Sequence, residues 1–129
     1  MYNPKIMEIL QNPQNAGMLR GANAIGRADS EVCSDIVKFY IEIENGVVKD
    51  AKFKTFGGAT LIAVCSITAK MIIGLSVEEI LNFNVNLVLN ELGEIAPQKD
   101  YCLNLTSRAL TNAVDDYYKR LEREANNHE

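Results

Sequence analysis

The sequence contains 129 residues, with 13 basic and 17 acidic side chains, three cysteines and one histidine. This length is typical of one domain, so we assign residues 1–129 to a single domain. A chain of this size buries enough apolar surface to fold without disulfides or a structural metal. The formal net charge of −4 and the scattered lysines and arginines argue against a nucleic acid as partner.

No apolar run approaches the roughly 20 residues of a membrane-spanning helix, and residues 1–10 lack the hydrophobic region of a signal peptide. We therefore expect a soluble, cytoplasmic protein without a membrane partner. Three widely spaced cysteines are typical of reduced thiols in a reducing compartment. The only histidine, His128, lies beside the chain end, which argues against a catalytic triad, a Cys/His dyad and a histidine-rich zinc site.

The N-terminal part of the chain predicts one helix and then extended chain. Asn3 and Pro4 are typical of a helix start, and they predict a helix over residues 3–11. A short extended piece is expected over 23–28, and 31–35 is a connection. Apolar and polar residues then alternate over 37–44, which is the pattern of a half-buried strand.

A second strand over 48–56 follows Asn45-Gly46 and predicts a β-hairpin. A two-residue turn at Asn45-Gly46 would place Phe39 opposite Lys52, with a charge on the buried face. A three-residue loop over 45–47 pairs Phe39 with Phe53 instead, and we prefer that loop. The same loop predicts the pairs Ile41 with Ala51, Val37 with Thr55 and Glu42 with Asp50.

The remainder of the chain predicts helices. They are an apolar helix over 61–73 closed by Gly74, a capped helix from Ser76 to about Asn82, a short helix over 86–92 and, after a loop over 93–100, a long amphipathic helix over 102–124. This order predicts an α+β fold in which helices cover one face of a small antiparallel sheet.

The cysteines differ in their predicted surroundings. Cys33 and Asp35 lie in a connection, where a thiol is accessible. Cys102 begins the last helix, three residues after Lys99, so it is either a thiol whose pKa the helix N-terminus lowers or a small packing residue. Cys65 lies in the apolar helix, where burial raises the pKa of a thiol and a packing role is expected.

Several segments, taken in order, resemble the IscU/NifU N-terminal family of iron–sulfur cluster assembly scaffolds. They are Asn12-Pro-Gln-Asn-Ala-Gly17, Val32-Cys-Ser-Asp-Ile36, Ala51-Lys-Phe-Lys-Thr-Phe-Gly-Gly58, Ile62-Ala63, Lys99-Asp-Tyr-Cys102, Ala109-Leu110 and Tyr117-Tyr118. The resemblance covers about residues 3–120. It implies a three-stranded antiparallel sheet with helices packed on one face.

The resemblance also implies a scaffold or carrier rather than an enzyme. Such a protein holds iron and sulfide, or a transient iron–sulfur cluster for which [2Fe–2S] is the favoured type, and passes it to apo iron–sulfur proteins. A cysteine desulfurase would deliver the sulfur as a persulfide. Zinc is an alternative metal, and a homodimer or an external thiol would complete the site.

The ligand residues follow from the resemblance position by position. Cys33-Ser34-Asp35 matches the family's Cys-Gly-Asp motif, and Cys102 matches the last ligand cysteine, which commonly accepts the persulfide. The implied cluster and metal ligands are therefore Cys33, Asp35 and Cys102. Thiolates are the usual ligands of iron–sulfur clusters, and a carboxylate keeps the cluster labile.

The sequence departs from the family at four places. Gly58 stands where the family has its middle cysteine, Tyr101 where a histidine is common, Ser34 where a glycine follows the first cysteine, and Ile95-Ala-Pro-Gln-Lys99 where some members carry a chaperone-recognition motif. Cys65 follows Gly58 by seven residues, ~10 Å along a helix, too far to take its place.

These departures motivate an alternative function. The chain would then be a divergent relative that assembles no cluster but binds a cysteine desulfurase, accepting a persulfide on Cys102 or binding zinc or iron weakly.

Overall fold

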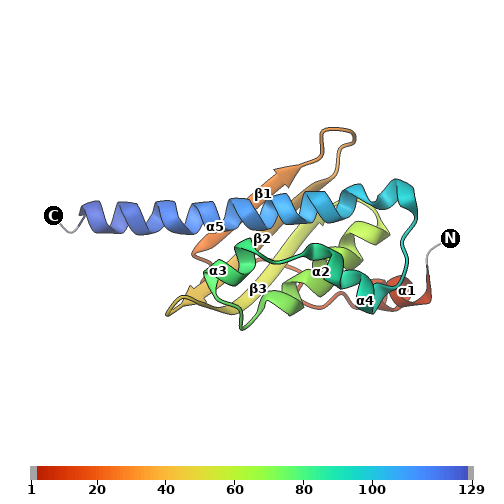
Figure 1. Cartoon of the computed structure of the whole chain (residues 1–129), viewed down its shortest axis with the longest axis horizontal. Helices are drawn as coiled ribbons and strands as arrows, with labels where there is room; N and C mark the ends of the chain where they lie inside the picture. Colours follow the sequence, from red (N-terminus) through yellow and green to blue (C-terminus); the bar gives the residue numbers. More distant parts are fainter. Residues whose placement is uncertain (1–2, 128–129) are drawn as a thin grey trace.

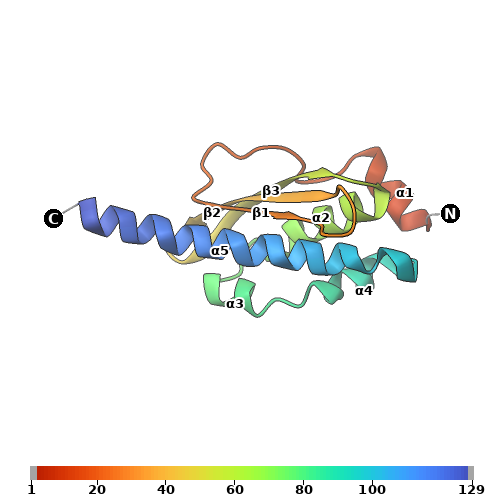
Figure 2. The same cartoon turned by 90° about the horizontal axis from the view of Figure 1, so that it is seen from above.

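The chain is described here by a computed structural model, which covers residues 3–127. Its elements are α1 (Pro4–Gln11), β1 (Ala24–Asp29), β2 (Ile36–Glu44), β3 (Val47–Phe56), α2 (Ala59–Ile72), α3 (Val77–Leu81), a 3-10 turn (Val85–Val88), α4 (Leu89–Leu92), a second 3-10 turn (Pro97–Lys99) and α5 (Tyr101–Asn127). The strands form one antiparallel sheet in the order β1-β2-β3. Helices α2 and α5 pack on the same face of this sheet (Figures 1 and 2). The predicted α+β fold is therefore confirmed.

Local signals place the helix starts as expected. The side chain of Asn3 accepts a hydrogen bond from the Ile6 N–H and donates one to the Leu92 carbonyl, which links α1 to α4. Ser76 and Glu79 form the predicted capping box of α3. The single helix predicted over 86–92 is wrong in form, because the chain there makes a 3-10 turn before the short α4.

The β2–β3 hairpin has the predicted register but a different turn. Phe39 pairs with Phe53, as expected. The connection, however, is a two-residue turn in which Asn45 and Gly46 both have positive φ, which matches the twist of the two strands. The extra residue, Lys49, lies in a β-bulge, so the predicted three-residue loop is wrong although the pairs beyond the bulge are right.

Helix α5 lies unusually close to β1. A Cβ atom at Gly26 would overlap the backbone of Ala109 and Ala113, so only a glycine permits this approach. The helix also pairs with the outer edge of the strand. Side chains four residues apart on α5 bond successive edge groups: Arg108 to the Asp29 carbonyl, Asn112 to the Arg27 carbonyl and Asp116 to the Ile25 N–H. These bonds occupy edge groups that would otherwise be open to another strand.

The segment between α1 and β1 crosses the opposite face of the sheet (Figure 2). It begins at the β3 edge, where the Gly17 N–H bonds to the Phe53 carbonyl, and it ends where Asn23 bonds to Ile41 and Ile43 of β2. The Tyr40 side chain beneath this segment is only 6% exposed. We call this face, opposite α2 and α5, the outer face.

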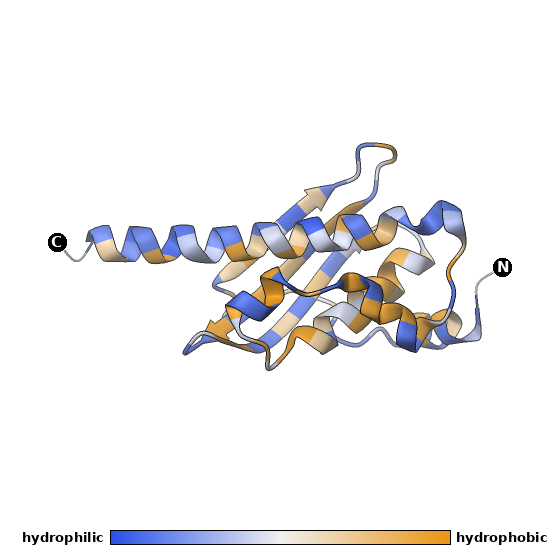
Figure 3. Cartoon of the chain, viewed as in Figure 1, coloured by the Kyte–Doolittle hydropathy of each residue, from blue (hydrophilic) through white to orange (hydrophobic). Residues whose placement is uncertain are grey.

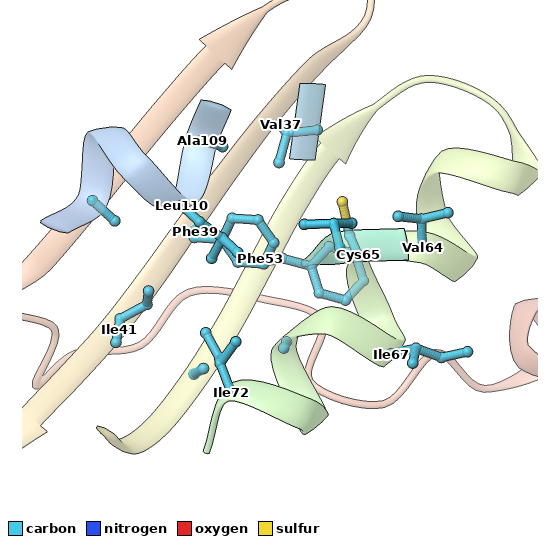
Figure 4. Packing of buried hydrophobic residues seen from close by; sticks show 14 of the residues in the cluster. Val37, Phe39, Ile41, Phe53, Val64, Cys65, Ile67, Ile72, Ala109 and Leu110 are labelled. Atoms are coloured by element: carbon cyan, nitrogen blue, oxygen red, sulfur yellow. The ribbon is translucent and has the colours of Figure 1, made fainter. Parts of the chain in front are cut away.

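The core lies between the sheet and the two long helices. Phe39, Phe53 and Leu110 meet there, and Cys65 of α2 lies among them (Figure 4). Helix α2 is apolar on nearly all sides because it is buried between the sheet and its helical neighbours (Figure 3). Within residues 3–127, no helix combines the length and the apolar character needed to cross a bilayer.

Candidate functional site

Three segments meet at one end of the sheet: the β1–β2 connection (30–35), the turn at Gly57 and Gly58, and the start of α5. The Tyr101 hydroxyl donates a 2.6 Å hydrogen bond to Asp35 Oδ2, which joins the connection to α5. The turn closes the other side, since a Cβ at Gly57 would lie 3.0 Å from Asp35 Cγ. Asp35 is thus the meeting point of the three segments.

The partner of the Asp35 carboxylate is a neutral tyrosine. The hydrogen bond to Asp35, and next to it burial, raise the pKa of Tyr101 far above its ordinary value. The phenol therefore keeps its proton at physiological pH and acts as a donor. A metal that binds Asp35 Oδ2 must compete with this hydrogen bond.

Cys33 lies where the sequence predicts, in an exposed connection. Its thiol donates to the Ser30 hydroxyl at 3.2 Å, and the Ser30 N–H bonds to the Asp35 carbonyl at 2.9 Å. The connection is therefore a small loop closed on itself, with Cys33 near its tip. The thiol is open to a metal or a reagent from solvent.

Cys102 is less reactive than its helix position suggests. The side chain is 1% exposed, and burial raises the pKa of its thiol to about 11, although the Tyr101 hydroxyl and the Lys99 charge act in the opposite direction. The reading in which the helix N-terminus lowers this pKa is wrong, because desolvation of a thiolate outweighs the partial charge of a helix end.

Cys65 has the packing role expected from its position. It is fully buried, and burial raises the pKa of its thiol to about 12. Its sulfur lies 3.6 Å from Thr106 Oγ1, and the same hydroxyl donates to the Cys102 carbonyl. Cys65 thus reaches α5 next to Cys102, a neighbour that no sequence pattern predicts.

The structure brings the predicted ligands Cys33, Asp35 and Cys102 to the same end of the sheet but does not assemble them. Among residues 3–127, no three Cys, Asp, Glu or His side chains are grouped closely enough to hold a metal. Cys33 is exposed, Cys102 is buried, and Asp35 is held by Tyr101. Sequence reasoning did not find this role of Tyr101, because the two residues are 66 positions apart and no local signal links them. His128 lies outside the described residues.

Gly58, at the place of the missing thiol, could hold a side chain. It precedes α2 as the N-cap with φ −86° and ψ −174°, an extended conformation open to any residue. A Cβ built there has no atom within 4 Å. Its neighbour Gly57 differs, since a Cβ there would meet Leu61 at 2.7 Å as well as Asp35.

Comparisons with known proteins agree with one another. The sequence profile of the NifU-like N-terminal domain matches residues 1–124. The iron–sulfur cluster assembly scaffold protein IscU 1 of Archaeoglobus fulgidus is 36% identical over 93% of this chain and 78% of its own length. The IscU scaffold protein of Aquifex aeolicus is 38% identical over 90% of this chain and 75% of its own length.

Among solved structures, the N-terminal NifU-like protein of Brucella abortus superposes with a TM-score of 0.70. Its sequence is 21% identical, and the match covers 91% of this chain and 94% of that one. At this identity the likeness concerns the fold alone.

Proposed function

The chain belongs to the family of NifU-like N-terminal domains, and from this membership we propose that it is an iron–sulfur cluster assembly scaffold or carrier. It holds iron and sulfide as cargo, in the form of a transient cluster, and passes the cluster to apo-proteins. Its relatives are named scaffold proteins, which supports this role over that of an enzyme.

One observation carries the proposal at the level of residues: two thiols and a carboxylate from distant parts of the chain lie around one end of the sheet. Cys33 and Asp35 come from the β1–β2 connection, and Cys102 comes from the start of α5. Thiolates bind iron in clusters, and a carboxylate ligand keeps the hold weak enough for transfer. We assign the cargo to Cys33, Asp35 and Cys102, with [2Fe–2S] as the cluster type and zinc as a competing metal.

Loading proceeds from the exposed side of the site inward. Iron meets Cys33 first, and it then takes the Asp35 carboxylate from the Tyr101 hydroxyl. Cys102 binds last, because its thiol must turn outward and lose a proton that burial makes difficult to remove. The three ligands therefore come together only as the iron binds.

Sulfur reaches the site from a cysteine desulfurase. The Cys102 thiolate attacks the outer sulfur of the desulfurase persulfide, the sulfur–sulfur bond of that persulfide breaks, and the desulfurase cysteine leaves as a thiolate. Because Cys102 is buried, the desulfurase must first expose it. In the alternative role, the chain would accept the persulfide on Cys102 but would not go on to form a cluster.

The chain supplies no thiol at Gly58, so a second subunit or an external thiol completes the coordination of the cluster. The open space at Gly58 would admit such a ligand. Homodimer formation and a cytoplasmic location remain predictions.

Anaerobic reconstitution tests the proposal. The wild-type chain, incubated with ferrous iron, cysteine, a cysteine desulfurase and dithiothreitol as the reductant that converts persulfide sulfur to sulfide, should develop cluster absorbance and contain acid-labile sulfide. Cys33→Ala and Cys102→Ala should each lose most of both signals. The matched control is Cys65→Ala, which also removes one thiol but leaves the three assigned ligands intact.

Two outcomes would count against the proposal. One is a wild-type chain that takes up neither iron nor sulfide. The other is an equal loss of cluster absorbance and acid-labile sulfide in all three cysteine variants, since Cys33 and Cys102 would then matter no more than the buried Cys65. A persulfide on Cys102, detected by mass spectrometry in a chain that forms no cluster, would support the alternative role.

A further inference from the structure

The segment between α1 and β1 covers only part of the outer face. It lies over the half of the sheet near the β2–β3 turn, where a Cβ at Gly21 would be 3.1 Å from the Glu42 carboxyl group and where Tyr40 is buried. Its hydrogen bonds to β3 end at Phe53. Beyond Phe53 and Tyr40, in the half that ends at the candidate site, residues 3–127 leave Arg27, Lys54 and Phe56 exposed.

Three cations form a row across this uncovered half. Arg27 of β1 pairs in register with Lys38 of β2, and Lys38 pairs with Lys54 of β3. Their neighbours in sequence, including Val37, Ala28 and Phe53, are buried on the helix side, so alternation places all three cations on the outer face. Adjacent strands are about 5 Å apart, which makes this a short, dense row of positive charge.

The row is compensated only in part within the chain. Arg27 forms an ion pair with Asp29 at 2.8 Å, and the Lys38 ammonium group lies 5.2 Å from the centroid of the Tyr40 ring. Among residues 3–127, however, neither Lys38 nor Lys54 forms an ion pair, so two adjacent positive charges face each other without an anion. Like charges directly opposite each other on neighbouring strands destabilise a sheet. An acidic group from outside the chain would relieve this repulsion.

An exposed aromatic side chain lies beside the row. Phe56 is the last residue of β3, is 67% exposed and pairs in register with Ile36. It directly precedes Gly57, whose Cβ position touches Asp35 of the candidate site. Aromatic residues and arginine are enriched in protein interfaces, and charges at the rim of an interface favour a partner of opposite charge.

We propose that this cationic face, formed by Arg27, Ile36, Lys38, Lys54 and Phe56, docks an acidic segment of a partner protein that carries an apolar side chain. Carboxylates of the segment pair with Lys38 and Lys54, and its apolar side chain packs on Phe56 and Ile36. The bound partner lies next to Asp35 and Cys33. A protein fits better than a nucleic acid, because the row is short and the whole chain carries a net charge of −4.

The inference is independent of the cluster chemistry and is tested without metal. The probe is a short fluorescein-labelled peptide with glutamates on both sides of a central leucine, and binding is followed by fluorescence anisotropy. Lys38→Glu/Lys54→Glu should weaken binding by roughly tenfold or more, because it replaces attraction by repulsion. The matched control, Lys119→Glu/Arg123→Glu, makes the same change in net charge on exposed positions of α5 and should bind as the wild type does.

A charge exchange separates a specific surface from general electrostatics. The same peptide with lysines in place of its glutamates should bind Lys38→Glu/Lys54→Glu and not the wild type. Phe56→Ser should weaken binding of the original glutamate–leucine peptide. With a peptide whose leucine is replaced by serine, the wild type and Phe56→Ser should bind with equal affinity. A cooperative thermal transition above the temperature of the binding assay confirms that each variant is folded.

The proposal is overturned if the wild type fails to bind the acidic peptide at low salt. It is also overturned if both double variants weaken binding equally, or if a single-stranded oligonucleotide of equal charge binds the wild type more tightly than the peptide does.

Discussion

Asp35 Oδ2 accepts a 2.6 Å hydrogen bond from the hydroxyl of Tyr101, a residue that immediately precedes Cys102. The bond joins the carboxylate that is proposed to bind iron to the helix that carries the buried thiol. As long as it is intact, a metal that binds Asp35 Oδ2 must displace the hydroxyl, and the start of α5 is tied to the β1–β2 connection. Tyr101 therefore competes with metal for the site.

Removal of this competitor should strengthen metal binding. Tyr101→Phe keeps the ring but removes the hydroxyl. A metal that binds Asp35 then no longer has to break the hydrogen bond from Tyr101. We expect Zn²⁺ to bind roughly tenfold more tightly, since a hydrogen bond to a charged group contributes about 1.5–3 kcal/mol. Competition with a chromophoric chelator measures the affinity. Tyr118→Phe, which alters an exposed tyrosine on the same helix, is the control, and weaker binding in Tyr101→Phe would instead make the phenol a ligand.

The buried thiol of Cys102 should make the fold sensitive to alkaline pH. Its pKa is about 11 in the folded chain against an ordinary value of 9.0. Between these values the unfolded chain loses its thiol proton while the folded chain keeps it, so the free energy of unfolding falls as pH rises and levels off above about pH 11. The share of Cys102 is on the order of 2 kcal/mol.

Urea unfolding at a series of pH values from neutral to alkaline measures this dependence. Because other groups also titrate, the readout is the difference in slope between the wild type and Cys102→Ala. The variant should lose less stability over the same pH range. Parallel curves for the two proteins would show that Cys102 does not contribute.

The contact between β1 and α5 should not tolerate a side chain at Gly26. Gly26→Ala places a methyl group against the backbone of Ala109 and Ala113, and backbone cannot move aside as a flexible side chain can. We expect a loss of about 3 kcal/mol or more in the free energy of unfolding, measured by urea denaturation. Gly58→Ser is the control, because its Cβ meets open space at a negative φ and serine is a favoured N-cap residue, so it should change stability little.

A thiol restored at Gly58 should stabilise the cargo without disturbing the fold. In Gly58→Cys the new side chain projects into open space beside the turn that contacts Asp35. We expect a higher cluster yield in anaerobic reconstitution and a several-fold slower loss of the cluster to a chelator, because a third thiolate replaces a weaker ligand. Transfer to an apo-protein should slow in proportion. Gly58→Ser, with a similar size but no thiolate, should behave as the wild type.

In the β2–β3 hairpin, the local sequence pattern predicted the strand register but not the turn. Alternation of apolar residues together with the short connection determined that Phe39 lies opposite Phe53, because a slip of one residue would turn the buried face outward. The turn was mispredicted because two solutions give this same register: a longer loop, or a tight turn with a bulge. The bulge at Lys49 prevails, and there the Lys49 ammonium group also approaches the carboxylates of Glu42 and Glu44, at 3.9 and 3.3 Å.

The sequence by itself determined the order of elements, the α+β class, the family resemblance and the candidate residues Cys33, Asp35 and Cys102. The elements and the fold class follow from periodicity and capping, which are properties of neighbouring residues, whereas the three candidate residues are what the family resemblance implies. Only the tertiary structure decided the state of each group. Burial of Cys102 on the inner side of α5 raises the pKa of its thiol, although the helix N-terminus acts in the opposite direction. Asp35 accepts a hydrogen bond from Tyr101, which is 66 positions away in the sequence. The cations that look scattered along the chain become a row for the same reason, since strand register brings Arg27, Lys38 and Lys54 side by side.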